Sequence, residues 1–328
     1  MTEIKEKKSI TNDALFCIDN KPIVIAGKWI KVAAVHDEDW LAGQVIDNPE
    51  SFISKLKESE LRADIFTFAQ KIPDCKPRYK FNMEWGNAAA IPITTYQEWW
   101  GRVPSDLRKD VRRAQKRGLV IEEVALNDEL IRGVVEMNNE TPIRQGRRFV
   151  HYGLDFETVK KGYSTYLDRS AFIGAFYENE LVGIIKMVYV GELACLMEIL
   201  SKIEHYDKRP TNALIAKAVE ICDRERKSYL TFGRYYYGNK EKSSIVDFKR
   251  RNGFERIIFP RYYVPLTAKG RVAVKLKLQL GLLGILPGTL ISVLVNLRSH
   301  LHRRALARGQ STARKEDRVK DEKTTEMG

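Results

Sequence analysis

The sequence predicts a mixed α/β fold, an α+β arrangement in which a central sheet is flanked by helices. Three apolar runs joined by short polar turns predict a meander of strands over residues 171–177, 181–190 and 193–201. An amphipathic helix follows, because apolar residues repeat along one of its faces: Leu214, Ala218, Ile221 and Cys222. A short strand over 229–233, a helix that stops at Gly253 and a strand over 257–264 complete this block. Alternation of this kind is typical of a mixed sheet covered by helices.

The preceding residues also alternate between strands and helices. A hairpin over 23–35 turns at Gly27 and Lys28, and Asn48 is a suitable N-cap for a helix over 49–61. Strands are expected over 65–69 and 79–85.

Between residues 94 and 170 helices dominate. Thr94 or Thr95 caps a helix that contains Trp99 and Trp100, and a basic helix then runs to a C′ glycine at Gly118. The later elements follow in order: a strand over 119–124, a helix from the cap Asn127 to 138, a polar loop over 140–153 and a helix over 155–169.

The chain has 328 residues, a net charge of +13 and a pI near 9.4. This excess of basic residues predicts attraction to anions such as phosphate groups, anionic lipid headgroups or nucleic acid. None of the four cysteines has CxxC spacing, and no metal-ligand spacing is present. We therefore expect neither a disulfide framework nor a metal site.

The C-terminal part differs from the rest. Residues 278–297 carry no charge, are interrupted by Gly281, Gly284, Pro287 and Gly288, and have basic flanks. This pattern predicts two short amphipathic pieces at a membrane surface, within a region that extends to 306. A helical hairpin packed on the domain and a transmembrane helix are the alternatives.

These patterns divide the chain into five parts: a disordered N-terminus (1–15), an α+β segment (16–94), the main domain (95–267), an amphipathic helical region near the membrane (268–308) and a disordered tail (309–328). The charged N-terminus has no apolar segment behind it. We therefore expect a cytoplasmic protein, peripheral at the inner face of the cytoplasmic membrane.

The loop over 206–212 is the predicted cofactor-binding site. It leads into the N-terminus of the amphipathic helix, where free N–H groups and the helix dipole favour an anion such as pyrophosphate. A capped surface helix with a basic entry loop is the alternative. The candidate residues are Tyr206, Lys208, Arg209, Thr211 and Asn212.

The loop over 141–153 is the predicted acceptor site. Guanidinium groups bind phosphate bidentately, so arginines with aromatic neighbours suit an anionic or sugar-phosphate ligand. A basic surface loop is the alternative. The candidate substrate-binding residues are Arg144, Gln145, Arg147, Arg148 and His151, with Lys249 from the later helix.

Several of these motifs together resemble one family. Glu198 in a strand, the loop and helix after 205, Leu230-Thr231-Phe232-Gly233, and Phe248-Lys249 followed by Gly253 are similar to the GNAT superfamily, most closely its FemAB-like and BioF2-like branch. Trp99-Trp100 and the basic helix that ends at Gly118 are similar to the same branch. The resemblance spans about residues 95–265 and allows residues 16–94 to be a degenerate first GNAT-like half.

The resemblance implies an acyltransferase that uses acetyl-CoA or another acyl-CoA. In such a reaction Glu198 would be the base and Tyr236, of Tyr235-Tyr236-Tyr237, the acid for the leaving group. A buried ion pair for Glu198 and a packing role for the tyrosines are the alternatives. The loop 208–213 lacks the glycines usual in the family, which leaves an aminoacyl-tRNA donor open.

The resemblance and the basic tail together suggest the acceptor. An amine or hydroxyl of a sugar or lipid-linked glycan precursor, as in envelope or extracellular polysaccharide synthesis, would suit both. A non-catalytic protein of GNAT-like fold that binds membrane or RNA is the alternative from another class.

Overall fold

The computed structural model describes residues 16–41, 46, 48–72, 74–144, 146–237 and 243–280. The predictions for 1–15, for 281–308 and for 309–328 therefore lie outside the described residues. The described residues up to Leu276 belong to one compact unit. The region from 268 is represented by α8 (Ala268–Lys275) and a 3₁₀ turn at Leu278–Leu280. Among the residues described here, no helix has the length and apolar character needed to cross a membrane.

The first part of the chain forms strands with a single helix. The strands are β1 (Phe16–Ile18), β2 (Lys21–Ala26), β3 (Val32–Val35), β4 (Ile65–Ala69) and β5 (Asn82–Pro92). The helix α1 (Pro49–Glu58) begins at the predicted cap, where the Asn48 side chain accepts from the Ser51 N–H. The strand predicted over 79–85 begins and ends later, because β5 continues through the alanine run 88–90. Alanine has no strand preference of its own, so pairing on both sides decides this extension.

The middle of the chain is mainly helical. Its elements are α2 (Tyr96–Arg102), α3 (Ser105–Lys116), β6 (Val120–Val124), α4 (Asp128–Asn139), β7 (Ile143–Arg144), β8 (Arg147–Arg148) and α5 (Phe156–Tyr163). Thr95 and Asn127 cap their helices, and Gly118 has a φ of +80° as a C′ residue. The helix predicted over 155–169 is wrong beyond Tyr163, because Tyr166 has a left-handed φ of 56° and a 3₁₀ turn follows at Leu167–Arg169.

The last part contains the predicted meander and the alternation after it. The elements are β9 (Ser170–Tyr177), β10 (Glu180–Val190), β11 (Leu193–Ser201), α6 (Pro210–Arg224), β12 (Tyr229–Thr231), α7 (Ser244–Arg251) and β13 (Glu255–Pro265). All three strands of the meander are confirmed. The predicted strand over 229–233 is shorter and ends at Thr231.

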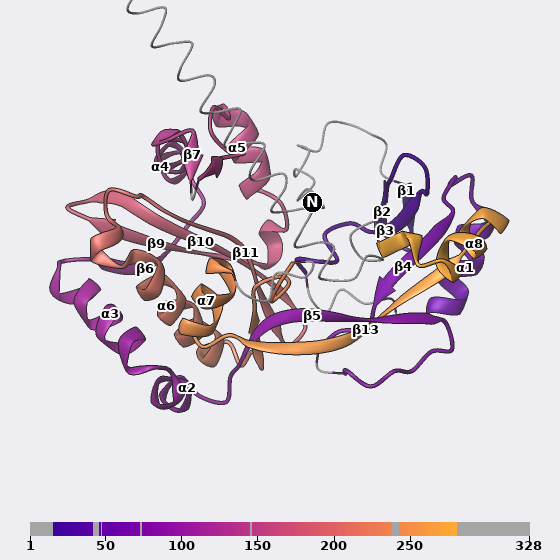
Figure 1. Ribbon diagram of the computed structural model, residues 1–328. Coiled ribbons are helices and arrows are strands. Elements are labelled where there is room, and N and C mark those ends of the chain that lie inside the picture. Colours follow the sequence, from indigo (N-terminus) through magenta and orange to yellow (C-terminus); the bar gives the residue numbers. More distant parts are fainter. Residues whose placement is uncertain are drawn as a thin grey trace, which may run out of the picture. The chain divides into compact units, whose positions relative to one another are not determined.

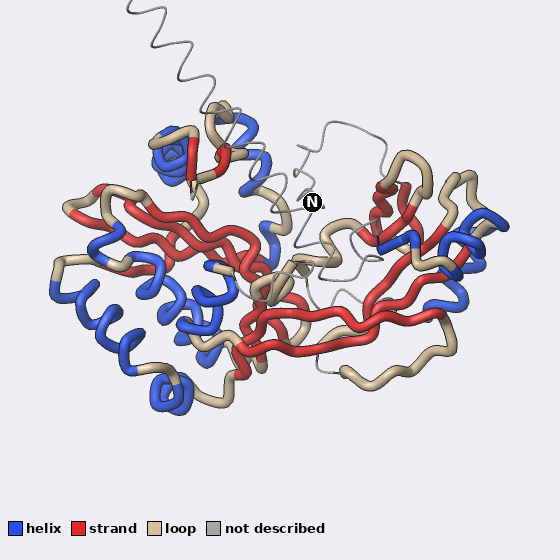
Figure 2. Tube along the Cα trace, viewed as in Figure 1, coloured by secondary structure: helices blue, strands red, loops and turns tan. Residues whose placement is uncertain are grey.

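A single mixed sheet contains strands from the first, middle and last parts of the chain (Figures 1 and 2). Its order is β1-β2-β3-β4-β13-β5-β12-β11-β10-β9-β6. The predicted fold class, a mixed sheet flanked by helices, is therefore confirmed. The long strand β5 pairs with β12 on one side and with β13 on the other. Because β13 also pairs with β4, the last strand of the chain joins the N-terminal strands to the meander.

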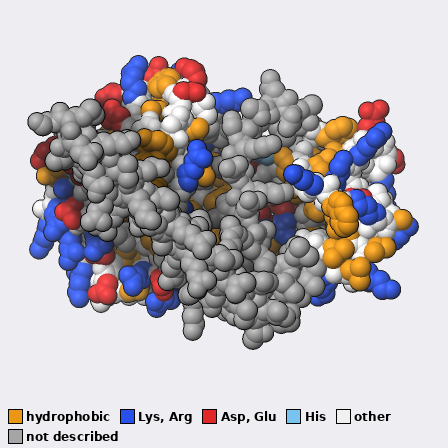
Figure 3. All heavy atoms as spheres, turned by 45° about the horizontal axis from the view of Figure 1, so that its top comes forward, with side chains coloured by type: hydrophobic (Ala, Val, Ile, Leu, Met, Phe, Trp, Pro, Cys, Tyr) orange, Lys and Arg blue, Asp and Glu red, His pale blue; other side chains and the backbone are white. Residues whose placement is uncertain are grey.

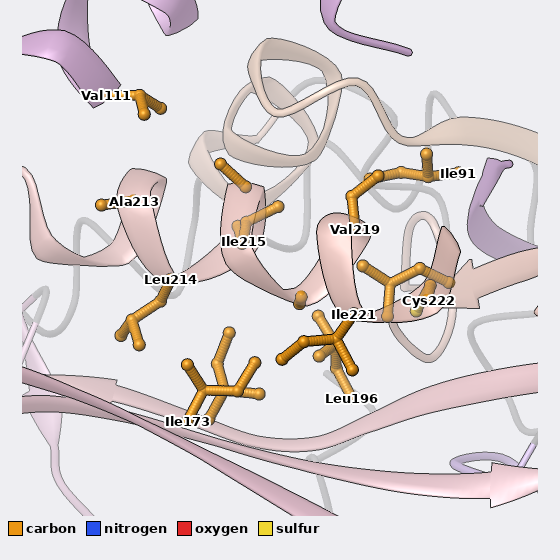
Figure 4. Packing of buried hydrophobic residues seen from close by; sticks show 14 of the residues in the cluster. Ile91, Val111, Ile173, Leu196, Ala213, Leu214, Ile215, Val219, Ile221 and Cys222 are labelled. Atoms are coloured by element: carbon orange, nitrogen blue, oxygen red, sulfur yellow. The ribbon is translucent and has the colours of Figure 1, made fainter. Parts of the chain in front are cut away.

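Helices cover both faces of the meander. On one face, α6 packs through Leu214 and Ile221 toward Ile173 and Leu196 (Figure 4), in a cluster that also includes α2 and α3. On the other face, α4 and α5 bury Ile131 and Tyr163 against β9 and β10. This burial of apolar side chains on both faces positions the ends of β11 and β12.

Candidate functional site

The candidate site begins where two parallel strands separate. The pairing between β11 and β12 covers only Leu193–Tyr229, Ala194–Leu230 and Cys195–Thr231. Beyond Thr231 the chain stays beside β5 and leaves β11. Phe232 N donates to Ala89 O on β5, and Ala89 N donates to Gly233 O, both at 2.9 Å. The segment of β11 from Met197 to Ser201 thus has an edge that no other described strand pairs with.

A β-bulge lies at this point. Cα partners shift between Lys186–Glu198 and Met187–Leu196, so Met197 is the extra residue. Glu198, Ile199 and Leu200 are only half-buried, although the preceding residues of β11 are buried. A bulge re-aims neighbouring side chains, and an unpaired strand edge can bind an extended ligand through its backbone.

The N-terminus of α6 follows the open part of β11. Residues Tyr206–Lys208 form a 3₁₀ turn, Arg209 has a φ of 61°, and Pro210 starts the helix. Thr211 and Asn212 lie in the first turn of α6, where backbone N–H groups have no intrahelical acceptor. No side chain caps this end of the helix. The structure therefore places the predicted anion-binding loop, with its free N–H groups, directly after the open strand.

The side chains of the same loop are held by neighbours. The Lys208 ammonium lies 4.4 Å from the Tyr177 ring centroid and 3.3 Å from His205 Nδ1. Arg209 Nε lies 3.3 Å from Asp110 Oδ1, and Tyr206 is exposed. The nearby carboxylates offset part of the positive charge, so the backbone N–H groups are the main attraction for an anion here.

Thr211 and Asn212 tie α6 to other elements of the site. The hydroxyls of Thr211 and Ser201 lie 2.8 Å apart, which links the first turn of α6 to the end of β11. Asn212 Nδ2 donates to Asn252 Oδ1 at 3.0 Å, which links the same turn to the end of α7. These contacts fix the helix N-terminus relative to the strand.

Glu198 lies beside a buried cation. Its Cα partner across the sheet is Lys186 on β10, whose ammonium donates to the carbonyls of Gly162, Tyr163 and Thr165 at 2.7–3.2 Å. Lys186 thus binds the C-terminal end of α5 to the sheet. Burial, and then the nearby Glu198 charge, raise the pKa of the Tyr163 hydroxyl well above its usual value. Glu198 is therefore a half-buried carboxylate on the face that α5 covers.

The three consecutive tyrosines have different surroundings. Tyr235 packs against the core under α6, and the Tyr236 ring lies 5.8 Å from the Arg256 guanidinium on β13. The Tyr237 ring lies 5.7 Å from Lys249 Nζ, close to Gly233 at the end of β12. The structure thus places Tyr237, rather than the predicted Tyr236, beside Lys249 and the strand separation.

Lys249 is buried, with 1% of its surface exposed. Its ammonium donates to Phe232 O at 2.9 Å and to Arg234 O at 2.5 Å. Desolvation lowers the pKa of Lys249 to about 8. Lys249 thus fixes the chain that leaves β12.

The predicted acceptor loop contains a short hairpin, β7 with β8. Arg144 is held inside it, because its guanidinium donates to Met137 O, Ser201 O and Glu140 at 2.7–2.9 Å. Arg147 and Arg148 are exposed, and the His151 ring lies 5.2 Å from the Phe149 ring. Gln145 lies outside the described residues. Arg144 thus joins the loop to the end of β11, and the other two arginines face solvent.

Sequence reasoning missed an ionic cluster beside the site, in which Glu38 and Arg261 are buried and Asp39 lies at the exposed edge. Arg261 on β13 contacts Glu38 at 3.0 Å and Asp39 at 2.7 Å, and Arg234 after β12 also contacts Asp39. Desolvation raises the pKa of Asp39, but the positive charges of Arg261, Arg234 and Lys71 lower it by more. The pKa of Asp39 therefore lies well below its usual range. The available signals were an acidic run, 37–39, and an arginine, Arg261, inside an apolar strand.

Lys71 lies in the same cluster, with 5% of its surface exposed. Its ammonium lies 5.8 Å from the Phe259 ring, and desolvation lowers its pKa. The cluster joins the segment 36–40 to β4, β13 and the loop after β12.

No group of His, Cys, Asp and Glu side chains suited to a metal ion occurs in the described part of the chain.

Comparison with known proteins identifies the fold. Neither a family model nor a curated protein matches the sequence. Among solved structures, the chain is similar to FemX, with a TM-score of 0.54 and 10% identity over 79% of this chain and 88% of FemX. L-PGS from Bacillus licheniformis (TM-score 0.46, 13% identity, 80% and 85% covered) and a tandem GNAT protein from the clavulanic acid biosynthesis pathway (0.42, 10%, 75% and 79%) are also similar. On the likeness to FemX, the chain has a GNAT-like fold.

Proposed function

We propose that this protein is an acyltransferase whose donor binds where β11 and β12 separate. The observation that carries the proposal is the open edge of β11 from Met197 to Ser201, which is followed directly by the uncapped N-terminus of α6. An extended donor can pair with a strand edge, and its phosphates can bind free N–H groups at a helix N-terminus.

The donor proposed first is acetyl-CoA or another acyl-CoA, as co-substrate. The N–H groups of Thr211 and Asn212 would bind the pyrophosphate, with Lys208 and Arg209 adding positive charge. The contact between Thr211 and Ser201 keeps this turn next to the strand edge. The pantetheine arm would run along β11 toward the bulge at Met197.

In the proposed step, an acceptor amine or hydroxyl attacks the thioester carbonyl. The new bond joins the acceptor to the acyl carbon, the C–S bond breaks, and the acceptor proton passes to the Glu198 carboxylate. The departing thiolate takes a proton from a tyrosine. The sequence predicts Tyr236 as this acid. Tyr237 is the better placed of the two, because it lies near Lys249 and Gly233.

The acceptor proposed is a sugar or a lipid-linked glycan precursor with an anionic group. Arg147 and Arg148 are exposed on a hairpin that Arg144 joins to the end of β11, so a bound anion would lie near the open strand. His151 and Gln145 belong to the same loop. Lys249 is engaged with backbone carbonyls, so its proposed role is to position the loop after β12.

Acetyl-CoA binding tests the donor. We expect calorimetry to show saturable binding by the wild type and weaker binding by the double variant Lys208→Ala/Arg209→Ala, which keeps the backbone N–H groups. The matched control is Lys57→Ala/Arg62→Ala, which removes two exposed basic residues from the region of α1. If folded wild-type protein does not bind, or if the control loses affinity equally, the acyl-CoA proposal is wrong.

Aminoacyl-tRNA is the second candidate donor, because residues 208–213 contain no glycine that would let the backbone approach a pyrophosphate closely. Titration with aminoacyl-tRNA in the same calorimeter distinguishes the two donors. A protein that binds neither would match the remaining alternative, a non-catalytic GNAT-like fold that binds membrane or RNA.

A further inference from the structure

A tryptophan in the N-terminal part of the chain lies exposed on a turn. Trp29 is 86% exposed, more than any other large apolar side chain that the structure describes. It lies between β2 and β3, where Gly27 has a φ of +100° and a Cβ would lie 2.1 Å from the Ile30 carbonyl oxygen. Only glycine fits this position without a clash, so this turn conformation requires Gly27.

Asp64 joins this turn to α8. Its carboxylate accepts from the Lys31 N–H at 2.9 Å, from the Thr267 hydroxyl at 3.1 Å and from the Lys269 ammonium at 3.1 Å. Lys269 also donates to the carbonyl of Trp29. The turn and the first residues of α8 are therefore one structural unit.

The outer side of α8 continues the apolar and basic character. Gly270, Ala273 and Val274 are buried, so the opposite stripe faces solvent. Val272 is 58% exposed, and Arg271, Lys275 and Leu276 are exposed beside it. We call Lys28, Trp29, Arg271, Val272, Lys275 and Leu276 the Trp29–α8 face. In Figure 3 hydrophobic and Lys or Arg side chains lie together at the end where Figure 1 shows α8 and β1–β4.

The charged residues of the face itself are all basic, and the nearby Asp64 carboxylate is mostly buried and paired with Lys269. No Asp or Glu occurs between Arg256 and Lys315, a stretch that holds twelve Lys and Arg residues. None occurs between Lys21 and Val35 either. An apolar surface whose exposed charged residues, Lys28, Arg271 and Lys275, are basic complements an anionic lipid surface.

The position of the face in the chain also indicates a membrane. The uncharged stretch 278–297 begins two residues after Leu276, and the described structure ends inside it at Leu280. A docked protein or nucleic acid would not require an adjoining run of twenty uncharged residues. A bilayer accommodates both the face and the start of that run.

We propose that the Trp29–α8 face docks on an anionic lipid bilayer. Trp29, Val272 and Leu276 enter the boundary between headgroups and acyl chains, and Lys28, Arg271 and Lys275 contact anionic headgroups. The contact adds the turn at Trp29 to the membrane-proximal region predicted over 268–308, and it does not depend on the proposed acyl transfer.

Vesicle binding by the full chain tests the proposal. Wild-type protein is expected to co-sediment with vesicles of phosphatidylcholine and phosphatidylglycerol, and much less with phosphatidylcholine alone. Brominated acyl chains are expected to quench tryptophan emission. Trp29→Ser is expected to lose this quenching and to bind roughly tenfold more weakly. Trp85→Ser is the matched control, because Trp85 on β5 is 55% exposed and outside the face.

A second pair of variants separates local charge from net charge. Lys28→Gln/Arg271→Gln/Lys275→Gln is expected to weaken binding about fivefold for each residue, since a basic residue near the surface contributes about 1 kcal/mol. The control Lys57→Gln/Arg62→Gln/Lys109→Gln has the same net charge. Equal losses in both triple variants, or unchanged binding and quenching in Trp29→Ser, would overturn the proposal. Circular dichroism shows whether each variant is folded.

Discussion

Arg261 Nη2 on β13 donates to Asp39 Oδ1 at 2.7 Å, although 222 residues separate them in the chain. The same guanidinium contacts Glu38, which is 4% exposed and accepts from the Ala69 N–H at 2.6 Å. These contacts fix the acidic segment 37–39 against the paired strands β4 and β13. Arg234 joins it from the loop after β12, so the cluster also positions one border of the candidate site.

Arg261→Ala is expected to destabilise the protein by about 3–5 kcal/mol, because it leaves the buried Glu38 carboxylate without its cation. Urea unfolding measures this change. Arg250→Ala is the control, since Arg250 forms an exposed pair with Asp247, and a change below about 1 kcal/mol is expected there. A small effect of Arg261→Ala would mean that the cluster is not a stabilising centre.

The same variant predicts a change in acid stability. The pKa of Asp39 is lowered in the folded protein, so its contribution to stability is present above the unfolded pKa and is lost as pH falls through the folded value. Without Arg261 the folded pKa of Asp39 moves up. Acid unfolding of Arg261→Ala is therefore expected to begin at a higher pH than acid unfolding of the wild type.

The lowered pKa of Lys249 predicts that the stability of the protein changes with pH in the alkaline range. Its pKa is about 8 in the folded protein, against an ordinary value of 10.5, so the unfolded chain binds more protons between these values. The free energy of unfolding of the wild type, relative to Lys249→Met, is expected to rise through this window by at most about 1.4 kcal/mol per pH unit. A difference that does not change with pH would show that Lys249 is not desolvated.

The arginines of the predicted acceptor loop are expected to behave differently from one another. Arg144→Ala removes donors from two backbone carbonyls and from Glu140, so a loss of about 2–4 kcal/mol is expected. Arg147→Ala/Arg148→Ala, on exposed β8, is expected to change stability by less than about 0.5 kcal/mol. Thermal unfolding measures both. Similar losses in the two variants would contradict this assignment.

Glu198→Gln tests the proposed base. If Glu198 accepts the acceptor proton, kcat falls roughly 10²–10⁴-fold and the acidic limb of the pH–rate profile disappears. Glu122→Gln, on exposed β6, is the control with unchanged activity. If Glu198→Gln retains wild-type kcat and a wild-type pH profile, Glu198 is a structural partner within the sheet.

Gly270→Ala tests the packing of α8. A Cβ at this position would lie 1.9 Å from the Asp64 carbonyl oxygen, so a loss of about 1–3 kcal/mol is expected. Gly162→Ala in α5 is the matched control, because a Cβ there meets nothing within 4 Å. Alanine has the higher helix propensity, so this control is expected to be more stable by about 0.5–1 kcal/mol.

Much of the fold could be predicted from local patterns. Apolar alternation located β9, β10 and β11, and the caps Asn48, Thr95 and Asn127 lie where their side chains suggested. The position of the predicted anion-binding loop before α6 follows from local pattern for the same reason, since a helix N-terminus is a local property. Errors occurred where local preference is weak, as in the alanine run of β5 and the break at Tyr166.

The site depended on information that local patterns do not contain. Arg144 was predicted from its charge, but its neighbours Met137 and Ser201 make it part of the scaffold. The surroundings of Tyr236 and Tyr237 differ although the residues are adjacent, because the chain turns after β12. The acidic segment 37–39 meets Arg261 only because β13 lies next to β4, a pairing between strands far apart in the chain.

The sequence by itself determined which segments of this protein are strands and helices, because hydrophobic periodicity and capping act within a few residues. Only the tertiary structure decided that β13 pairs with both β4 and β5, that β11 and β12 separate after Cys195, and that Asp39 meets Arg261. These contacts join residues distant in the chain, and their free energy depends on burial and charge pairing that exist only after the sheet has formed.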